Sequence, residues 1–141
     1  MSVGRICVRS VATTTPEETL RAAARRMREH GVGSLVVVDG KTRPVGVLTD
    51  RDLMLRCVAD AGDADEVRVA QAMSTPVVTA REAMPIEDVL SQMSASAIRR
   101  VPVIDEAGTL VGILSLDDVL DLLSEEVTTI GRVLSNRAPK A

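Results

Sequence analysis

Two matched segments of the chain carry the side chains best suited to chemistry. Gly46–Asp52 reads Gly-Val-Leu-Thr-Asp-Arg-Asp, and Gly112–Asp118 reads Gly-Ile-Leu-Ser-Leu-Asp-Asp. In both, a hydroxyl residue follows a short apolar run, and an aspartate stands three residues later. This pattern is typical of a capping box, in which the hydroxyl and the carboxylate satisfy free backbone N–H groups at a helix start. The same helix start offers N–H groups and a positive dipole end to an anion such as phosphate.

The side chains of these segments also suit a nucleotide. A carboxylate at Asp52 or Asp118 can accept paired hydrogen bonds from the vicinal hydroxyls of a ribose. The hydroxyl of Thr49 or Ser115 can reach a phosphate, and a glycine in the preceding strand allows a ligand to approach closely. Capping and ligand binding therefore both remain open interpretations of the motif.

The other reactive side chains indicate structural roles. His30 precedes Gly31 at an expected helix end, where an imidazole favours the negative end of the dipole. Cys7 and Cys57 form no CxxC pair, so we expect reduced, structural thiols and no metal site. No nucleophile with a positioned base is evident in the sequence, and we predict that the chain is not an enzyme.

The motif occurs twice because the chain is duplicated. The segment Thr13–Leu53 aligns with Thr79–Val119 at a constant offset in residue number, without a gap. A repeat of this length is one supersecondary unit that leaves an apolar face uncovered, so two copies are expected to pack together. Any cleft between them is then built twice.

Each copy predicts the element order strand, helix, strand, strand, helix. In the first copy, apolar residues at helical spacing end at Gly31. Thr15 and Thr19 are both good caps for the start of that helix, and the alignment of Thr19 with Pro85 favours the later start. A β-hairpin is expected next, and helical spacing returns after Thr49. The hairpin strands are predicted at Leu35–Val38 and Val45–Leu48. The second copy predicts an extended segment at Val77–Thr79, a helix at Pro85–Ser96, hairpin strands at Val101–Ile104 and Leu110–Leu114, and a helix from Ser115 to about Leu123.

Beyond the second copy, Val127, Ile130, Val133 and Leu134 keep helical spacing and predict a further amphipathic helix. Its apolar stripe needs a partner, in the same subunit or in a second one. We divide the chain into a first repeat at 1–62, a linker and lead-in at 63–73, a second repeat at 74–125, and a C-terminal helix and tail at 126–141.

The composition is that of a soluble globular protein, with 45% apolar and 26% charged residues in 141. No apolar run has membrane-spanning length, and the first residues do not resemble a signal peptide, so we expect a cytoplasmic protein. The net charge of −3 and the absence of Phe, Tyr and Trp argue against nucleic-acid binding, although local basic patches remain possible.

The duplicated unit resembles a pair of cystathionine β-synthase (CBS) domains, often called a Bateman module. The motifs that carry this resemblance are the two glycine-to-aspartate segments and Ile98–Asp105, which reads Ile-Arg-Arg-Val-Pro-Val-Ile-Asp. The lead-in Ala70–Thr79 is also similar to the family pattern, and Ile6–Thr13 is a weaker version of it. The resemblance covers the chain from about Ile6 to Leu123.

The resemblance implies an α/β fold of two β-α-β-β-α units packed through their sheets about a pseudo-twofold axis. It further implies a regulatory module without a catalytic group or a required cofactor. An adenosine nucleotide (AMP, ADP or ATP) is the regulatory ligand that it implies, bound in clefts between the repeats. Two chains are expected to form a flat homodimer, which signals to an unknown protein partner.

By resemblance, Asp52 and Asp118 hold ribose hydroxyls, while Thr49 and Ser115 approach phosphate. Thr13 and Thr79 are implied to lie near the adenine through their backbone, and Arg99 and Arg100 to meet phosphates. These are the eight ligand-binding residues that we expect.

The copies differ at the arginine pair, because Gly33 and Ser34 occupy the positions that match Arg99 and Arg100. The two clefts are therefore expected to differ in charge. One rival hypothesis is a ligand-independent scaffold protein, in which the motifs only cap helices and the clefts are vestigial. A small nucleotide-processing enzyme is a second rival, for which the sequence shows neither a base nor a metal cluster.

Overall fold

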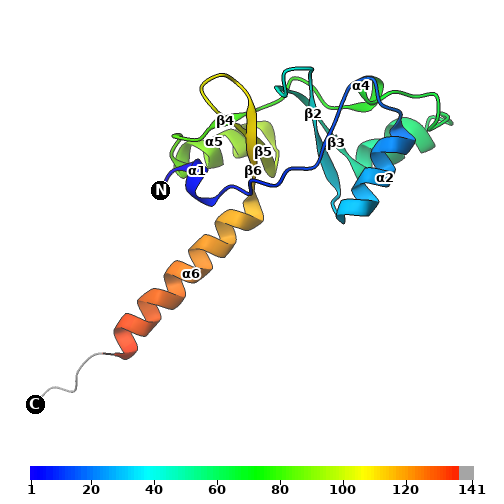
Figure 1. The fold of residues 1–141 in the computed structure, drawn as a ribbon. Helices are drawn as coiled ribbons and strands as arrows, with labels where there is room; N and C mark the ends of the chain where they lie inside the picture. The colour runs from blue at the N-terminus through cyan, green and yellow to red at the C-terminus, as the bar shows by residue number, and fades with distance from the viewer. Residues whose placement is uncertain (137–141) are drawn as a thin grey trace, which may run out of the picture.

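The computed structural model describes residues 1–136 and contains two small sheets with helices beside them (Figure 1). In each three-stranded sheet, the first strand runs parallel to the second, and the second pairs antiparallel with the third. The first sheet contains β1 (Thr13–Thr14), β2 (Ser34–Val38) and β3 (Pro44–Thr49). The second contains β4 (Ala80–Arg81), β5 (Arg100–Ile104) and β6 (Leu110–Ser115). The predicted fold class is confirmed.

The helices follow the order that the duplication predicts, with one short helix added before each repeat. The first repeat contains α2 (Leu20–His30), α3 (Asp50–Leu53) and the π-helical turn η1 (Met54–Val58). The second contains α5 (Ile86–Ser96) and α6 (Leu116–Ser135). The added helices are α1 (Val3–Ile6) and α4 (Val69–Ala72).

The start of α2 is at the second of its two candidate caps. The Thr19 side chain accepts a hydrogen bond from the backbone N–H of Ala22, at 3.2 Å. The helix ends at Gly31, which has the left-handed φ of 63° that glycine adopts readily. At the matching position, α5 ends at Ala97 with a φ of 53°. The second repeat therefore keeps the turn without its glycine, at a cost of about 1 kcal/mol.

The two hairpins have the same register. Val37 pairs with Gly46 in the first sheet, and Val103 pairs with Gly112 in the second. Both hairpins bulge directly after that pair. The constant offset found in the sequence is thus also the offset of the backbone hydrogen bonding. Both predicted hairpins are confirmed, whereas the strand expected at Val77–Thr79 lies slightly later, at β4.

The lead-in segments are exchanged between the repeats. The helix α1 precedes the first repeat, but its Val3 donates a backbone hydrogen bond to Met84 at 2.9 Å. Val8 then forms an antiparallel bridge with Ile113 of β6. The first residues of the chain therefore complete the second unit.

The second lead-in packs in the reciprocal way. The backbone N–H of Val69 in α4 donates to Glu18 at 2.9 Å, and Ser74 bridges to Val47 of β3. In Figure 1, α4 lies over the first sheet and α1 beside the second. Each unit thus packs against the lead-in of the other. Relative movement of the two units must therefore also move both lead-ins.

The core consists of two aliphatic clusters that follow this exchange. One contains Leu20, Ala23, Met27, Leu35, Val37, Leu48, Cys57, Val69 and Ala72. The other contains Val3, Ala80, Ile86, Val89, Met93, Val101, Val103, Leu114 and Val119. The methionines at matching positions of α2 and α5, Met27 and Met93, are buried in these clusters.

The last helix differs from the prediction. The sequence suggested a helix to about Leu123 and a further one around Val127–Leu134, but α6 is a single helix of 20 residues. Neither proline nor glycine occurs between Leu123 and Ile130, so nothing there breaks the hydrogen-bond ladder. The tail beyond residue 136 lies outside the described residues. Within residues 1–136, no helix combines the length and apolar character needed to cross a membrane.

Candidate functional site: two clefts between the repeats

Both motifs form the capping box that their spacing predicts. The Thr49 side chain accepts from the Asp52 N–H at 3.1 Å, and the Thr49 N–H donates to Asp52 Oδ2 at 2.9 Å. Ser115 and Asp118 repeat these contacts at the same distances. In each carboxylate, Oδ1 has no hydrogen bond to another described residue. Capping therefore leaves one oxygen of each aspartate available to a ligand.

One cleft, here called the Thr49 cleft, has a volume of about 290 Å³. It lies between Val47 and Thr49 of β3, the lead-in residues Pro76–Val78, and Ile98–Arg100 at the start of β5. The hydroxyl cap therefore comes from the first repeat, and the facing segments come from the second.

The other cleft, the Ser115 cleft, has the same volume of about 290 Å³ and the reciprocal composition. Ser115 and Asp118 at the start of α6 face the lead-in residues Ser10–Ala12 and the segment Gly31–Ser34. Both volumes lie near the lower end of the range for small-molecule sites. Each cleft is lined by residues of both repeats.

The two clefts meet at a pair of matched residues. Ser34 and Arg100 occupy equivalent positions in the two repeats, at the first residue of β2 and of β5. Each of them lines both clefts. The two clefts are therefore adjacent, and they share one serine and one arginine in their linings.

The clefts differ in charge. The Thr49 cleft is lined by Arg99 and Arg100 and by no acidic residue. The Ser115 cleft contains Asp118 together with Arg100, and Gly33 takes the place of Arg99. Both arginines are exposed, and neither guanidinium forms a hydrogen bond or ion pair with another residue of the described part. They are free to bind an anion.

Of the eight predicted residues, the structure brings five into the clefts. Thr49, Arg99, Arg100, Ser115 and Asp118 line them. Thr13, Thr79 and Asp52 are not among the lining residues. The chain reaches the clefts just before the two threonines, at Val11–Ala12 and Val77–Val78.

Sequence reasoning assigned no site role to these lead-in residues or to Ser34. A signal for the lead-ins was present, because Ser10–Ala12 and Pro76–Val78 stand at the same offset from each other as the two motifs. No sequence pattern indicates that each lead-in packs against the other repeat and so faces the helix cap of that repeat.

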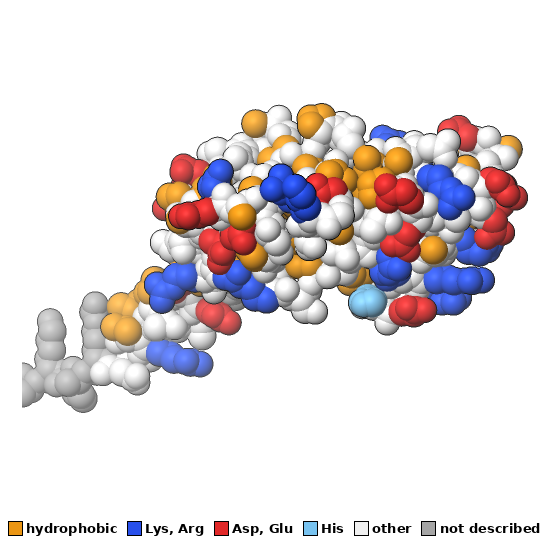
Figure 2. Space-filling model, turned by 45° about the horizontal axis from the view of Figure 1, so that its top comes forward, with side chains coloured by type: hydrophobic (Ala, Val, Ile, Leu, Met, Phe, Trp, Pro, Cys, Tyr) orange, Lys and Arg blue, Asp and Glu red, His pale blue; other side chains and the backbone are white. Residues whose placement is uncertain are grey.

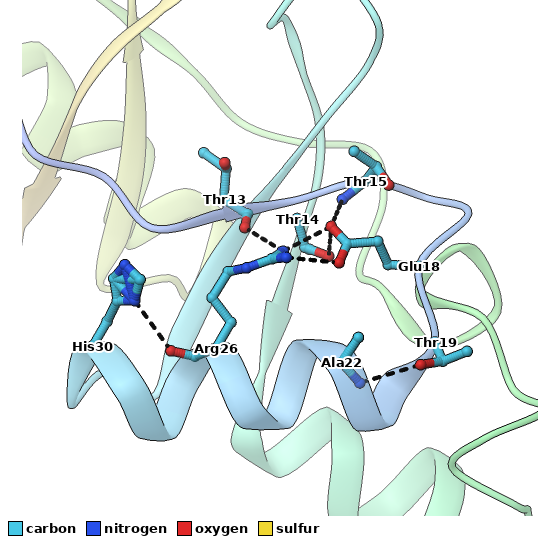
Figure 3. A network of polar contacts seen from close by, with 8 residues as sticks. All are labelled: Thr13, Thr14, Thr15, Glu18, Thr19, Ala22, Arg26 and His30. Carbon is cyan, nitrogen blue, oxygen red and sulfur yellow. Dashed lines mark hydrogen bonds and ion pairs between the residues drawn. The ribbon is translucent and has the colours of Figure 1, made fainter.

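A polar network centred on Arg26 of α2 holds the end of the first lead-in and the loop before that helix (Figure 3). Arg26 donates to both carboxylate oxygens of Glu18, at 2.7 and 2.8 Å, and to the Thr13 carbonyl oxygen at 2.9 Å. Glu18 also accepts from the buried Thr14 hydroxyl and from the Thr15 N–H, both at 3.2 Å. The hydrogen bond from Arg26 holds the pKa of Glu18 below its ordinary value. This network fixes β1, directly after the residues that line the Ser115 cleft.

The second repeat lacks that network. Met84 and Gln92 stand where the first repeat has Glu18 and Arg26. The Gln92 Oε1 atom is buried and has no hydrogen-bond partner within residues 1–136. No side chain corresponding to Arg26 therefore holds the carbonyl of Thr79.

The remaining reactive groups lie outside the clefts. His30 Nδ1 is 3.3 Å from the Arg26 carbonyl oxygen at the exposed end of α2 (Figure 3). Cys7 and Cys57 are free thiols, and burial raises the pKa of Cys7. No three His, Cys, Asp or Glu residues of the described chain are grouped so that they could hold a metal ion.

Comparison with known families and proteins agrees with the duplicated architecture. The family model "CBS domain" matches twice, at residues 3–58 and 68–125. An uncharacterized protein of Methanopyrus kandleri is 40% identical over 130 residues, which are 92% of this chain and 66% of that protein. The chain thus spans about two thirds of the length of this relative.

Two solved structures extend the comparison to three dimensions. Hypoxic Response Protein I, crystallised with two coordinated zinc ions, superposes with a TM-score of 0.79 at 31% identity, over 86% of this chain and 98% of that one. The CBS domain pair of protein MJ0100, in complex with 5′-methylthioadenosine and S-adenosyl-L-methionine, has a TM-score of 0.78 at 26% identity. That alignment covers 89% of this chain and 98% of the other.

Proposed function

Because the chain belongs to the CBS domain family, we propose that it is a regulatory module that senses adenosine-containing nucleotides in its two clefts. The ligand is AMP, ADP or ATP, and the module itself catalyses no reaction. The observation that carries this proposal is the construction of each cleft, in which a helix cap of one repeat faces the lead-in of the other. The adenosine compounds bound by the MJ0100 domain pair support the ligand class.

In the Ser115 cleft, the free Oδ1 of Asp118 accepts hydrogen bonds from the ribose hydroxyls, and the Ser115 hydroxyl and Arg100 approach the phosphate. The adenine lies against aliphatic side chains, among them Val11 and Val32, because the chain has no aromatic residue to stack on it. Asp52 and Thr49 take the corresponding roles in the other cleft, and the backbones at Thr13 and Thr79 lie near the base.

The different charges of the two clefts favour nucleotides with different numbers of phosphates. Arg99 and Arg100 provide two guanidinium groups with no lining carboxylate, which suits the several negative charges of ADP or ATP. The carboxylate of Asp118 beside a single arginine suits a less charged ligand such as AMP. The Thr49 cleft is therefore the polyphosphate site of the two.

Sensing follows from the fact that each ligand touches both repeats. A nucleotide that binds one relative arrangement of the repeats more tightly shifts the population toward it. An unidentified protein partner in the cytoplasm reads the altered surface of a homodimer. Because coupling is reciprocal, binding of that partner must change the nucleotide affinity by the same factor.

One observation favours a second candidate function. Both aspartates complete a capping box, a structural role that explains their spacing without any ligand. A ligand-independent interaction protein with vestigial clefts would also need these caps. The two functions differ in what happens when the carboxylate charge is removed.

The test is thermal unfolding of wild type, Asp118→Asn and Asp52→Asn, with AMP, ADP, ATP, S-adenosylmethionine and NAD added in turn. We expect nucleotide to raise Tm, because a ligand at 100 times its Kd stabilises the folded state by about 2.7 kcal/mol. Each aspartate variant is expected to lose the part of this rise that its own cleft contributes, and to keep the ligand-free Tm.

Asp121→Asn is the matched control, since it removes a carboxylate one turn further along α6 and outside both clefts. Capping alone would be supported if the aspartate variants had a lower ligand-free Tm and kept the nucleotide-induced rise. It would also be supported if their ligand-free Tm fell and wild type itself showed no nucleotide-induced rise.

A further inference from the structure

The helix α6 leaves the body of the molecule with its apolar stripe uncovered. Figure 1 shows it projecting away from both repeats, and Figure 2 shows hydrophobic side chains on the surface of the projecting part. The exposed apolar residues are 53–68% accessible: Leu120, Leu123, Val127, Ile130, Val133 and Leu134. No other described element of the chain covers them.

The spacing of the stripe is that of a two-helix seam. Steps of four and three residues alternate along Leu116, Leu120, Leu123, Val127, Ile130 and Leu134. An apolar residue every 3.5 positions lets two helices supercoil, each side chain fitting between four of the partner. A helix that packs on a flatter globular surface typically has a broader stripe, with a period of 3.6. The pattern therefore favours another helix with the same repeat, and an identical helix supplies one.

The charges beside the seam favour a second copy in the parallel orientation. Between Val119 and Leu134, the only charged residue at a position flanking the seam is Glu126. In a parallel pair in register, Glu126 faces Gly131 of the second copy, and no like charges meet. In the antiparallel register that pairs Leu123 with Val127, the two Glu126 carboxylates meet each other. Asp121, Glu125 and Arg132 occupy positions remote from the seam.

We propose that two copies of the chain associate through the α6 stripe as a parallel coiled coil, in register from Leu120 to Leu134. This inference specifies the contact surface of the homodimer in the proposed function, and the seam itself stands independently of any ligand. The same helix begins at the Ser115–Asp118 cap, which forms one wall of the Ser115 cleft. A nucleotide bound there contacts the first turn of the helix that carries the dimer seam.

The first test is sedimentation velocity of the full chain over a range of concentrations. Wild type is expected to be a dimer. The double variant Val127→Glu/Ile130→Glu should be mainly monomeric, with a dimer dissociation constant at least tenfold higher than that of wild type. Thr128→Glu/Thr129→Glu is the matched control, because it adds the same charges to the same turns away from the seam, and it should remain dimeric. Circular dichroism checks that both variants keep their helix content.

A monomeric wild type, an assembly larger than two, or a dimer that persists in Val127→Glu/Ile130→Glu would overturn the proposal. The seam variant should still show the nucleotide-induced rise in Tm if that rise exists in wild type. The result therefore separates failure of the seam from failure of ligand sensing.

The orientation is tested by disulfide formation. Val127→Cys should form a 127–127 link between copies under mild oxidation, located by peptide mapping. Glu125→Cys, on the outer face of the same turn, should not. Linkage found only in a mixture of Leu123→Cys with Val127→Cys chains would indicate the antiparallel pair and would overturn the parallel arrangement.

Discussion

The Thr49 cleft and the Ser115 cleft share one backbone plan and differ in a few side chains. The hairpin register, the bulge, the capping box and the exchanged lead-in are the same in both repeats. The side chains differ at two matched positions. Gly33 lines the Ser115 cleft where Arg99 lines the Thr49 cleft, and Ser34 of the first repeat corresponds to Arg100 of the second. Duplication thus supplies the geometry of two sites, and substitutions at the strand starts give them different charges.

The largest loss of stability is expected when a side chain is added where a lead-in packs against a hairpin glycine. A Cβ added to Gly112 would lie 2.8 Å from Cys7 Sγ and 3.0 Å from the Val8 carbonyl oxygen. Gly112→Ala is therefore expected to lower the free energy of unfolding by about 1–3 kcal/mol. Urea denaturation measures the change.

The matching substitution in the first repeat is Gly46→Ala. A Cβ at Gly46 would meet Met73 Sδ at 2.8 Å and the Ser74 carbonyl oxygen at 3.1 Å. The longer, flexible methionine can move aside more easily than a cysteine. Gly46→Ala should thus cost less than Gly112→Ala, and equal stability of both variants and wild type would refute the close packing of the lead-ins.

The next effect concerns affinity. Arg99→Ala is expected to weaken ATP binding in the Thr49 cleft roughly tenfold and to leave the Ser115 cleft unchanged, because loss of one charge-assisted hydrogen bond costs about 1.5 kcal/mol. Arg100→Ala should weaken both sites, since its side chain lies at their boundary. Calorimetric titration resolves the two sites, with Arg132→Ala on α6 as control. Identical titrations for both variants would contradict the assignment of one arginine to one cleft.

A smaller effect is expected from removing the ion pair found only in the first repeat. Arg26→Gln introduces the residue that the second repeat has at this position and removes the donor to Glu18 and Thr13. The free energy of unfolding should fall by about 1 kcal/mol at neutral pH. A fall in stability with unchanged nucleotide affinity would show that the pair fastens β1 without shaping the Ser115 cleft.

The pH dependence of that difference gives the sharpest form of the test. Because the folded pKa of Glu18 is lowered from 4.5, its contribution to stability is present above that value and is lost as the pH falls through the folded pKa. The stability gap between wild type and Arg26→Gln should therefore shrink from pH 7 toward pH 3. A gap that stays constant over this range would mean that charge pairing is not its origin.

Much of the fold could be predicted from local sequence patterns. The Thr49 and Ser115 caps and both hairpins depend on residues that are close in the chain, so their spacing alone predicts them. The constant offset between Thr13–Leu53 and Thr79–Val119 further indicated that the copies share one register. The break expected inside α6 was wrong, since the end of the repeat pattern after Leu123 does not by itself end a helix.

The candidate site was less accessible to sequence reasoning because it depends on long-range packing. The exchange of α1 and α4 between units places Ser10–Ala12 opposite Ser115, and no local pattern specifies such a pairing. Arg100 also lines both clefts, whereas the sequence shows only that Gly33 and Ser34 replace the arginine pair in the first repeat. The ligand-binding roles given to all eight residues stay predictions, and Thr13, Thr79 and Asp52 are not among the residues that line the clefts.

We propose above all that each cleft, built from both repeats, holds an adenosine nucleotide. A crystal structure of the full chain grown with millimolar AMP or ATP tests it most directly. We predict adenine beside the lead-in of one repeat, ribose at the Asp118 or Asp52 carboxylate of the other, and phosphate toward Arg100. Clefts that remain empty at that concentration, or nucleotide bound only elsewhere on the surface, would contradict the account.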